Sequence, residues 1–202
     1  MNFQKLLEDE INKIKDNKTK PKLLLHACCG PCSSYVIEYL SNYFDITIYY
    51  YNPNTYPETE YFRRLTELQK FINSFNNNVR VIEEKYEPSE FYAAIKGLEH
   101  LGERTERCYK CYNLRMKKSA IYAKENNYDY FTTTLSISPY KDAKWINEIG
   151  INLEKEIGIK YLYSDFKKNN GYKRSIELSK EYKLYRQEYC GCVYSKNERE
   201  TK

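Results

Sequence analysis

Apolar residues recur along the chain with two alternating periods. Phe3, Leu7, Ile11 and Ile14 stand three or four residues apart among charged and amide side chains, which predicts an amphipathic helix. From residue 22 onward, short apolar or β-branched runs alternate with longer segments of helical periodicity. The runs predict strands at 22–27, 45–51, 79–83, 128–134 and 159–163, and the periodic segments predict helices at 33–43, 58–75, 89–96, 109–126 and 141–157.

This alternation predicts an α/β protein with a doubly wound, mostly parallel sheet of about five strands and added helices. A length of 202 residues fits one domain. We expect three parts: an N-terminal helix in 1–20, a sheet core in 22–165 and a helical C-terminal segment in 166–202. Ligands of such sheets bind beyond the carboxyl ends of the strands. The site is therefore expected among the segments 26–34, 52–60 and 132–141.

The chain shows no sequence signal for a membrane. No stretch reaches the roughly 18 consecutive apolar residues of a membrane span, and residues 1–20 lack the apolar core of a signal peptide. We therefore expect a cytoplasmic protein without a membrane partner. Cysteines in that compartment are kept reduced, so the seven cysteines of this chain indicate metal binding or redox chemistry before they indicate disulfides.

The cysteines fall into three groups, and none stands alone. They are Cys28, Cys29 and Cys32 in HACCGPC, Cys108 and Cys111 in RCYKC, and Cys190 and Cys192 in YCGCVYS. Two of these groups contain a CxxC pair, a spacing that lets two thiolates reach one metal ion or two irons of one cluster.

Three kinds of site compete for these cysteines. A structural zinc site would use Cys29, Cys32, Cys108 and Cys111, and would leave the other three cysteines unexplained. The CGPC sequence after a strand also matches a dithiol oxidoreductase, but more thiols are present than a dithiol needs. A 4Fe-4S cluster with four ligands, beside a CGC pair that holds a second iron or cycles as a dithiol, accounts for most of the set. We favour iron-sulfur redox chemistry.

The positive charge is concentrated in one segment. The net charge is +5, and Lys160–Arg186 alone holds eight basic and three acidic residues, with five tyrosines among them. Aromatic rings beside Lys and Arg suit stacking on unpaired bases next to phosphate contacts. The other interpretation is a solvated helix face in a tyrosine-rich chain.

Five ordered motifs together resemble the QueH-type epoxyqueuosine reductases. The motifs are HACCGPCSS, YNPNTYPETEYFRR, GERTERCYKCYNLRM, FTTTLSISPYKD and YCGCVYS, and they extend from His26 to Ser195. The resemblance implies a cobalamin-independent enzyme in which a 4Fe-4S cluster, working beside a second redox or iron site, removes the epoxide oxygen of epoxyqueuosine in tRNA. It also implies a Rossmann-like nucleotide-binding fold of the HUP type, shared with tRNA-thiolating ATPases. Cysteines replace the phosphate loop of those ATPases here, so ATP-dependent adenylation is disfavoured.

The resemblance also implies a role for each cysteine group. The 4Fe-4S ligands would be Cys28, Cys29, Cys108 and Cys111, and the catalytic second pair would be Cys190 and Cys192. Cys32 stays open between a ligand of an adjacent mononuclear iron and a buried thiol. The partners would be tRNA and an unidentified electron donor of the ferredoxin or flavodoxin kind. A zinc-stabilised tRNA-binding module without redox chemistry remains the main alternative.

Polar residues after the second and fourth predicted strands are candidates for substrate contacts. They are Asn52, Asn54, Glu60, Ser136, Ser138 and Lys141. Turn residues or helix caps are equally good interpretations of each. Tyr56, Tyr61 and Tyr140 are candidates for base stacking, although a chain with 23 tyrosines uses most of them elsewhere.

Overall fold

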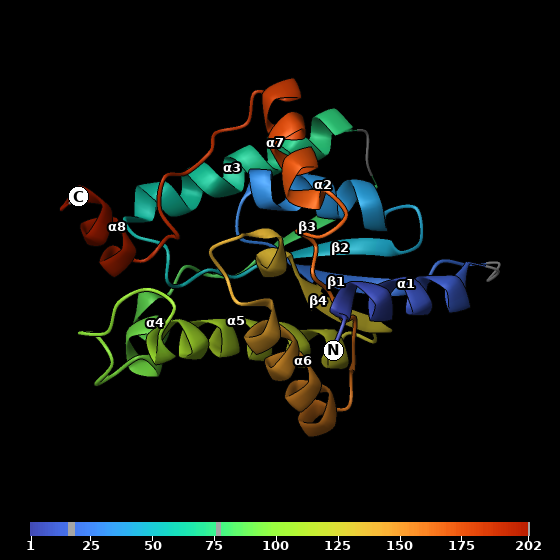
Figure 1. Ribbon diagram of the computed structural model, residues 1–202, viewed down its shortest axis with the longest axis horizontal. Coiled ribbons are helices and arrows are strands. Elements are labelled where there is room, and N and C mark those ends of the chain that lie inside the picture. The colour runs from blue at the N-terminus through green and yellow to red at the C-terminus, as the bar shows by residue number, and fades with distance from the viewer. Residues whose placement is uncertain (16–18, 76–77, 202) are drawn as a thin grey trace.

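Five parallel strands form the centre of the computed structural model, which describes residues 1–15, 19–75 and 78–201 (Figure 1). The strands are β1 (Lys22–His26), β2 (Asp45–Tyr50), β3 (Arg80–Glu83), β4 (Tyr130–Thr133) and β5 (Lys160–Tyr161), in the order β3-β2-β1-β4-β5. Every pairing between them is parallel, with β1 between β2 and β4. The predicted five-stranded, Rossmann-like sheet is confirmed.

Helices cover both faces of this sheet, as the doubly wound prediction requires (Figure 1). The helices are α1 (Phe3–Ile14), α2 (Gly30–Leu40), α3 (Glu58–Phe75), α4 (Pro88–Ala94), α5 (Glu106–Glu125), α6 (Ala143–Ile157), α7 (Gly171–Glu181) and α8 (Val193–Glu200). Helix α2 packs against α3 and α7 on one face, and α5 packs against α6 on the other. None of the described helices is both long and apolar enough to cross a membrane.

The two faces of the sheet carry separate cores because successive strand residues point to opposite sides. Leu23 and Leu25 of β1 pack in the core with apolar residues of α1, α2 and α3. Leu24, between them, packs with apolar residues of α5 and α6. All three leucines are fully buried, and each contributes about 1.5–3 kcal/mol relative to an exposed side chain.

Several element boundaries differ from the sequence prediction. Helix α2 begins at Gly30 rather than at residue 33, because Cys29 is an extended N-cap and Pro31 fits the first turn of the helix. Helix α5 begins at Glu106, before both of its cysteines. A 3₁₀ helix, η1 (Thr134–Ile137), follows β4 and was not predicted.

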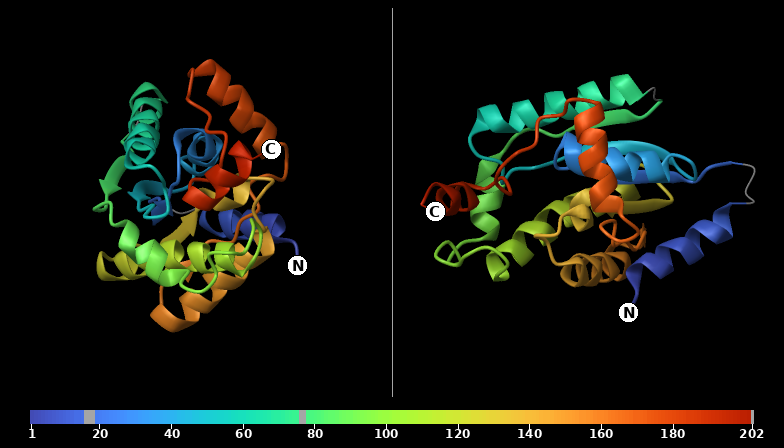
Figure 2. Two further views of the ribbon diagram at one scale, coloured as in Figure 1. Left: turned by 90° about the vertical axis from the view of Figure 1, so that its left-hand side faces the viewer. Right: turned by 45° about the horizontal axis from the view of Figure 1, so that its top comes forward.

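The ends of the chain follow the predicted pattern only in part. Within the expected N-terminal helix of residues 1–20, α1 ends at Ile14, and residues 16–18 lie outside the described part of the chain. After α7, residues 182–192 form a segment, here called the C-terminal arm, that passes along α3 to α8 (Figure 2). The division of the chain into three parts stays a prediction.

Candidate metal and substrate site

The first thiol group, Cys28, Cys29 and Cys32, lies at the carboxyl end of β1 and the start of α2. The three Sγ atoms lie within 4.8 Å of one another, and those of Cys28 and Cys29 are 3.8 Å apart. Cys28 and Cys29 are buried and Cys32 is half-buried. This arrangement can hold a metal ion, and it lies where the strand order reverses, which is where ligands of such sheets bind.

Backbone hydrogen bonds position the first thiol group. The amide of Ala27 continues the sheet by donating to the carbonyl of Tyr49 (3.1 Å). The carbonyl of Ala27 accepts a hydrogen bond from Asn52 Nδ2 (2.9 Å). The carbonyl of Cys29 accepts from the Ser33 amide (3.2 Å) and from the Ser33 hydroxyl (2.7 Å). The β1–α2 turn is therefore fixed by the sheet on one side and by the first turn of α2 on the other.

The second thiol group, Cys108, Cys111, Cys190 and Cys192, joins distant segments of the chain. Cys108 and Cys111 lie in the first turns of α5, three residues apart and so on one face of the helix. Cys190 and Cys192 come from the end of the C-terminal arm. All four side chains line one small cavity of about 20 Å³ together with Asn54, whose buried Oδ1 has no hydrogen-bond partner in the described residues.

Arg64 of α3 attaches the C-terminal arm to the rest of the protein. Its guanidinium is 2 % exposed. It donates to the carbonyls of Cys190 (3.0 Å) and Tyr189 (3.2 Å), and its Nε forms an ion pair with Glu60 (2.7 Å). Gly191 has a φ of +143°, and an added Cβ there would lie 3.0 Å from Arg64 Nη1. The turn between the two cysteines therefore has the conformation and the space of a glycine.

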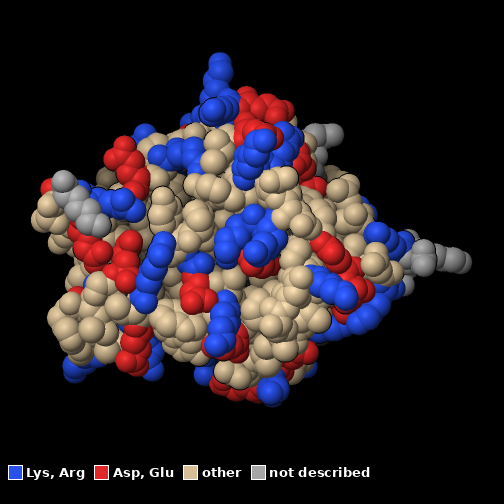
Figure 3. Space-filling model, in the orientation of Figure 1, with Lys and Arg blue, Asp and Glu red and all other residues tan. Residues whose placement is uncertain are grey.

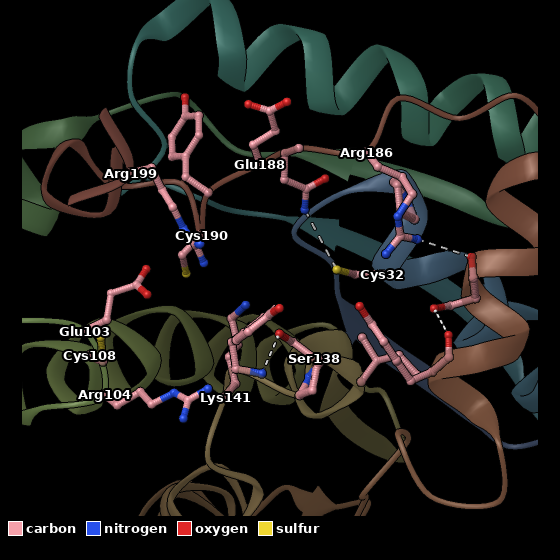
Figure 4. A pocket seen from close by; sticks show the side chains of 18 of the residues that line it. Cys32, Glu103, Arg104, Cys108, Ser138, Lys141, Arg186, Glu188, Cys190 and Arg199 are labelled. Carbon is pink, nitrogen blue, oxygen red and sulfur yellow. Dashed lines mark hydrogen bonds between the residues drawn. The ribbon is translucent and has the colours of Figure 1, made fainter. Parts of the chain in front are cut away.

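The two thiol groups meet at a larger cavity of about 310 Å³, here called the thiol-lined cavity. Its volume is in the usual range of small-molecule sites, about 300–1,000 Å³. Cys32 of the first group and Cys108 and Cys190 of the second line it, and these are the three half-buried thiols. Figure 4 shows these side chains entering the cavity from different segments of the chain, with Lys141 on the wall below.

Positive charge surrounds the thiols. Four cationic residues line the thiol-lined cavity, Arg104, Lys141, Arg186 and Arg199, against two carboxylates, Glu103 and Glu188. Figure 3 shows basic side chains near the centre of the face that contains the cavity, with acidic ones among them.

Arg115 of α5 lies between the two thiol groups and is buried. Burial by itself lowers the pKa of Arg115. The electrostatic interaction with Cys111, Cys190 and Cys28 outweighs burial, so the pKa is raised. Its Nη2 has no hydrogen-bond partner within the described residues. For half-buried Lys141, burial is likewise outweighed by Cys190 and Cys28, which raise its pKa. Buried cations without carboxylate partners suit a centre that carries several thiolates.

The thiols themselves must lose protons to bind a metal. Burial, aided by neighbouring Cys28, raises the pKa of Cys29 to about 12. Burial also raises the pKa of Cys111 to about 12, against the opposing effect of Arg115. Hydrogen bonds from Cys29 and Cys32 hold the pKa of Cys28 well below its usual range. Metal binding at these groups therefore releases protons.

His26 is a structural residue at the end of β1. Its Nε2 lies 3.1 Å from the carbonyl of Tyr51, which can only accept, so Nε2 carries the proton. Its Nδ1 then accepts from the Thr133 hydroxyl at 2.8 Å. Burial, with Arg115 nearby, lowers the pKa of His26 to about 3. Both ring nitrogens are engaged in a neutral imidazole.

The six candidates for substrate contacts fall into two sets: three line a cavity, and three make internal hydrogen bonds. Ser138 and Lys141 line the thiol-lined cavity, and Asn54 lines the small cavity beside the second thiol group. The other three make internal hydrogen bonds: Asn52 with Ala27, Glu60 with Arg64, and Ser136 with Ser164 at 2.9 Å. The substrate roles of all six stay predictions.

The basic segment 160–186 reaches the thiol-lined cavity at three residues, Tyr172, Ser175 and Arg186, of which Arg186 is basic. Lys160 forms an ion pair with Glu10, and the Arg174 guanidinium binds both oxygens of Glu38, at 2.6 and 3.0 Å. Nucleic-acid binding by this segment stays a prediction.

Three residues that the sequence prediction did not place at the site are central to it. Arg64 holds the arm, Arg115 lies between the thiol groups, and Gln187 donates from Nε2 to Cys29 Sγ at 2.9 Å. The four-residue step from Cys111 to Arg115 on one helix is a signal that could have found Arg115. The same step from Glu60 to Arg64 is a signal for their ion pair, and no local pattern marks Gln187.

Comparison with known proteins identifies the family. The family model described as epoxyqueuosine reductase QueH matches residues 23–198. The chain belongs to the QueH family. It is 43% identical over 199 residues to the epoxyqueuosine reductase QueH of Streptococcus pyogenes, covering 96% of this chain and 78% of that protein.

Further QueH relatives match at a similar level. The protein of Staphylococcus epidermidis is 44% identical over 201 residues, covering 96% of this chain and 84% of the relative. The protein of Thermotoga maritima is 36% identical over 181 residues, covering 89% of this chain and 93% of the relative. The matched range 23–198 contains all seven cysteines and both thiol groups. The family resemblance of the sequence motifs is thus confirmed.

Proposed function

We propose that this chain is a tRNA epoxyqueuosine reductase that removes the epoxide oxygen of epoxyqueuosine with a 4Fe-4S cluster. The observation that carries the proposal is that seven free cysteines form two groups that meet at one cavity. Buried Arg115 and half-buried Lys141 supply the positive charge that such a centre needs. The relatives are named as epoxyqueuosine reductases, which supports the substrate.

The donor set fits an iron-sulfur cluster with a second site beside it. We assign Cys28, Cys29, Cys108 and Cys111 to the cluster, and the catalytic pair Cys190 and Cys192, with Cys32, to a mononuclear iron. Two observations support adjoining sites that draw on both thiol groups. Cys32, Cys108 and Cys190 line one cavity, so the two thiol groups adjoin. Arg115 also interacts electrostatically with Cys28 of the first thiol group and with Cys111 and Cys190 of the second.

Conversion of an epoxide to an alkene and water consumes two electrons and two protons. When bound, the cluster would supply electrons one at a time and the second iron would act as a Lewis acid. The protein itself supplies the surroundings of the departing oxygen. Lys141 lines the cavity, and its Nζ, which the nearby thiols keep protonated, would donate a hydrogen bond or a proton to that oxygen. Ser138 lines the same cavity and can hold the substrate.

The partners follow from this chemistry. The substrate is a nucleoside within a tRNA anticodon, so the enzyme would act in the cytoplasm where mature tRNA is present. The two electrons come from a small electron-transfer protein of the ferredoxin or flavodoxin kind. Half-buried Cys190 and Cys32 line a cavity that a substrate can enter, which supports a reaction close to the second site.

The decisive experiment combines a spectrum with a reaction. Protein purified without oxygen should be brown, with the broad visible absorption of 4Fe-4S proteins, and should bleach with dithionite. With dithionite as reductant, it should convert epoxyqueuosine in tRNA to queuosine, detected as the loss of one oxygen atom by mass spectrometry of the nucleosides. Colourless protein that holds only zinc after anaerobic reconstitution would overturn the proposal in favour of a zinc-stabilised tRNA-binding module.

A further inference from the structure

Tyr140 is an exposed aromatic residue between two cavities. Its side chain belongs to the segment that joins η1 to α6, and it is 58 % exposed. It lines the thiol-lined cavity. It also lines a second cavity of about 200 Å³, here called the side cavity. An exposed ring of this size beside a site is available for stacking on a flat ligand.

The side cavity is continuous in its lining with the thiol-lined cavity. Five residues line both, among them Tyr140 and Arg104, and the side cavity adds Asp142 and half-buried Trp145. The Asp142 carboxylate accepts from the amides of Lys144 (2.7 Å) and Trp145 (3.2 Å) as the N-cap of α6. Its charge is therefore directed to the start of the helix, and the remaining lining is aromatic, apolar or cationic.

Two guanidinium groups from different parts of the chain converge on the Tyr140 ring. Arg104, in the loop before α5, lies 5.7 Å from the ring centroid, and Arg199 of α8 lies 5.9 Å from it. Both arginines are exposed, and neither forms a salt bridge with a described carboxylate. An aromatic platform flanked by arginines without acidic partners is the arrangement that binds bases and phosphates of single-stranded nucleic acid.

We propose that the side cavity binds the nucleotide next to the one that is reduced, with its base stacked on Tyr140 and its phosphate held by Arg104 and Arg199. The inference rests on the proposed function, because it takes RNA as the substrate. Two cavities that share one wall suit two consecutive nucleotides of a loop, one in each. Binding of the neighbouring nucleotide would hold the reactive base over the thiols.

Trp145 provides a direct probe of the side cavity because it is the only tryptophan in the chain. The probe ligand is a synthetic RNA stem-loop with the sequence of an anticodon arm, whose loop carries an unmodified guanosine at the wobble position. We expect the RNA to quench Trp145 fluorescence in the anaerobically purified protein. A DNA duplex of the same length, which presents no unstacked bases, should quench much less.

Variants separate stacking from charge. Tyr140→Ala should weaken stem-loop binding about 5- to 150-fold, the range for loss of one base–aromatic stack, whereas Tyr140→Phe should bind like the parent. Arg104→Gln and Arg199→Gln should each flatten the dependence of log affinity on log salt by about 0.7–0.9. The matched controls are Tyr92→Ala, at a ring 41 % exposed that lines neither cavity, and Arg80→Gln at the start of β3.

The outcomes distinguish this inference from the proposed function. If the parent protein reduces epoxyqueuosine in tRNA and Tyr140→Ala binds the stem-loop as tightly as the parent, the inference is wrong and the proposed function stands. The same holds if Arg104→Gln and Arg199→Gln change the salt slope no more than Arg80→Gln. If the parent neither binds the stem-loop nor reduces epoxyqueuosine in tRNA, the proposed function and this inference are both overturned.

Discussion

The two thiol groups are positioned by different kinds of contact. Cys28, Cys29 and Cys32 lie within five residues on a turn whose carbonyls bind neighbouring amides and the buried Asn52 side chain. Cys190 and Cys192 lie beside Cys108 and Cys111 on a segment held by contacts with distant residues, among them Arg64, 126 positions away from Cys190, and Tyr56. The position of the first thiol group therefore depends on the sheet. The position of the second thiol group depends on how the C-terminal arm is attached.

This difference suggests where the site can open. Adjacent strands share a continuous ladder of backbone hydrogen bonds that must break together. The arm is held by separate contacts, among them those of Arg64 and Tyr185 and the bond from the Tyr56 amide to the Gly191 carbonyl, which can break one at a time. The second group is thus the part of the site whose geometry single substitutions should disturb most. The predictions below compare the two groups, beginning with the largest expected effect.

Removing thiols from the proposed cluster should abolish the chromophore. We expect Cys28→Ala and Cys108→Ala to lose cluster iron and sulfide, and activity with them, because each would be one of four ligands. Cys190→Ala should keep much of the brown chromophore and lose turnover. Iron, sulfide and visible absorption of the anaerobically purified variants decide the assignment.

The same measurements can contradict the proposed division of ligands. Cluster content unchanged in Cys108→Ala would exclude that residue as a ligand. If Cys190→Ala lost iron and sulfide as completely as Cys108→Ala, while Cys28→Ala kept both, the four thiols around the small cavity would form the ligand set by themselves. Full activity of Cys190→Ala would remove the arm from the chemistry.

Arg64→Met should loosen the end of the C-terminal arm that carries Cys190. The substitution leaves the Glu60 carboxylate and the carbonyls of Tyr189 and Cys190 without their guanidinium partner. Loss of one partner of a buried ion pair costs about 3–5 kcal/mol of the free energy of unfolding. In metal-free protein, alkylation of Cys190 should become faster while that of Cys28 changes little, as measured by mass spectrometry.

The control for Arg64→Met is Lys117→Met on α5. Lys117 pairs with Glu156 at the surface, where such a pair contributes about 0–1 kcal/mol. Equal alkylation rates of Cys190 in the parent, Arg64→Met and Lys117→Met would show that the arm does not depend on Arg64.

Gly191→Ala should distort the turn between the two cysteines of the arm. A non-glycine residue at a φ of +143° is strained, at a cost of about 1–3 kcal/mol, and the new Cβ would approach Arg64 Nη1. Gly102→Ala is the matched control, because an added Cβ there has no heavy atom within 4 Å. We expect slower turnover in Gly191→Ala alone; the same kcat in both variants would argue against a strained turn.

Ser33→Ala should have the smallest effect. It removes the hydroxyl that donates to the Cys29 carbonyl, but the Ser33 amide still donates to the same oxygen. The expected cost is about 0.5–1.5 kcal/mol of the free energy of unfolding, with unchanged iron content. Ser119→Ala removes the same kind of bond in α5 and should cost a similar amount. Iron loss in Ser33→Ala only would mean that the first group also depends on side chains.

The order of strands and helices could be predicted from the sequence because both leave a local period. Strand residues such as Leu23–Leu25 form a short apolar run, and α3 shows its buried face as repeated apolar residues. The same local information shows seven cysteines in three groups, and the spacing of two of the groups favours a metal. The motifs around these cysteines also identify the family, which comparison confirms.

Only the tertiary structure decided which polar residues near the cysteines face the cavity. Glu60, Ser136 and Lys141 all follow strand ends in the sequence, yet Glu60 pairs with Arg64, Ser136 bonds Ser164, and Lys141 lines the cavity. The same holds for the tyrosines: Tyr61 is 1% exposed and Tyr140 58 %. These outcomes depend on contacts between residues far apart in the chain. Such contacts leave no period in the sequence, because either partner alone is compatible with a turn, a cap or a surface.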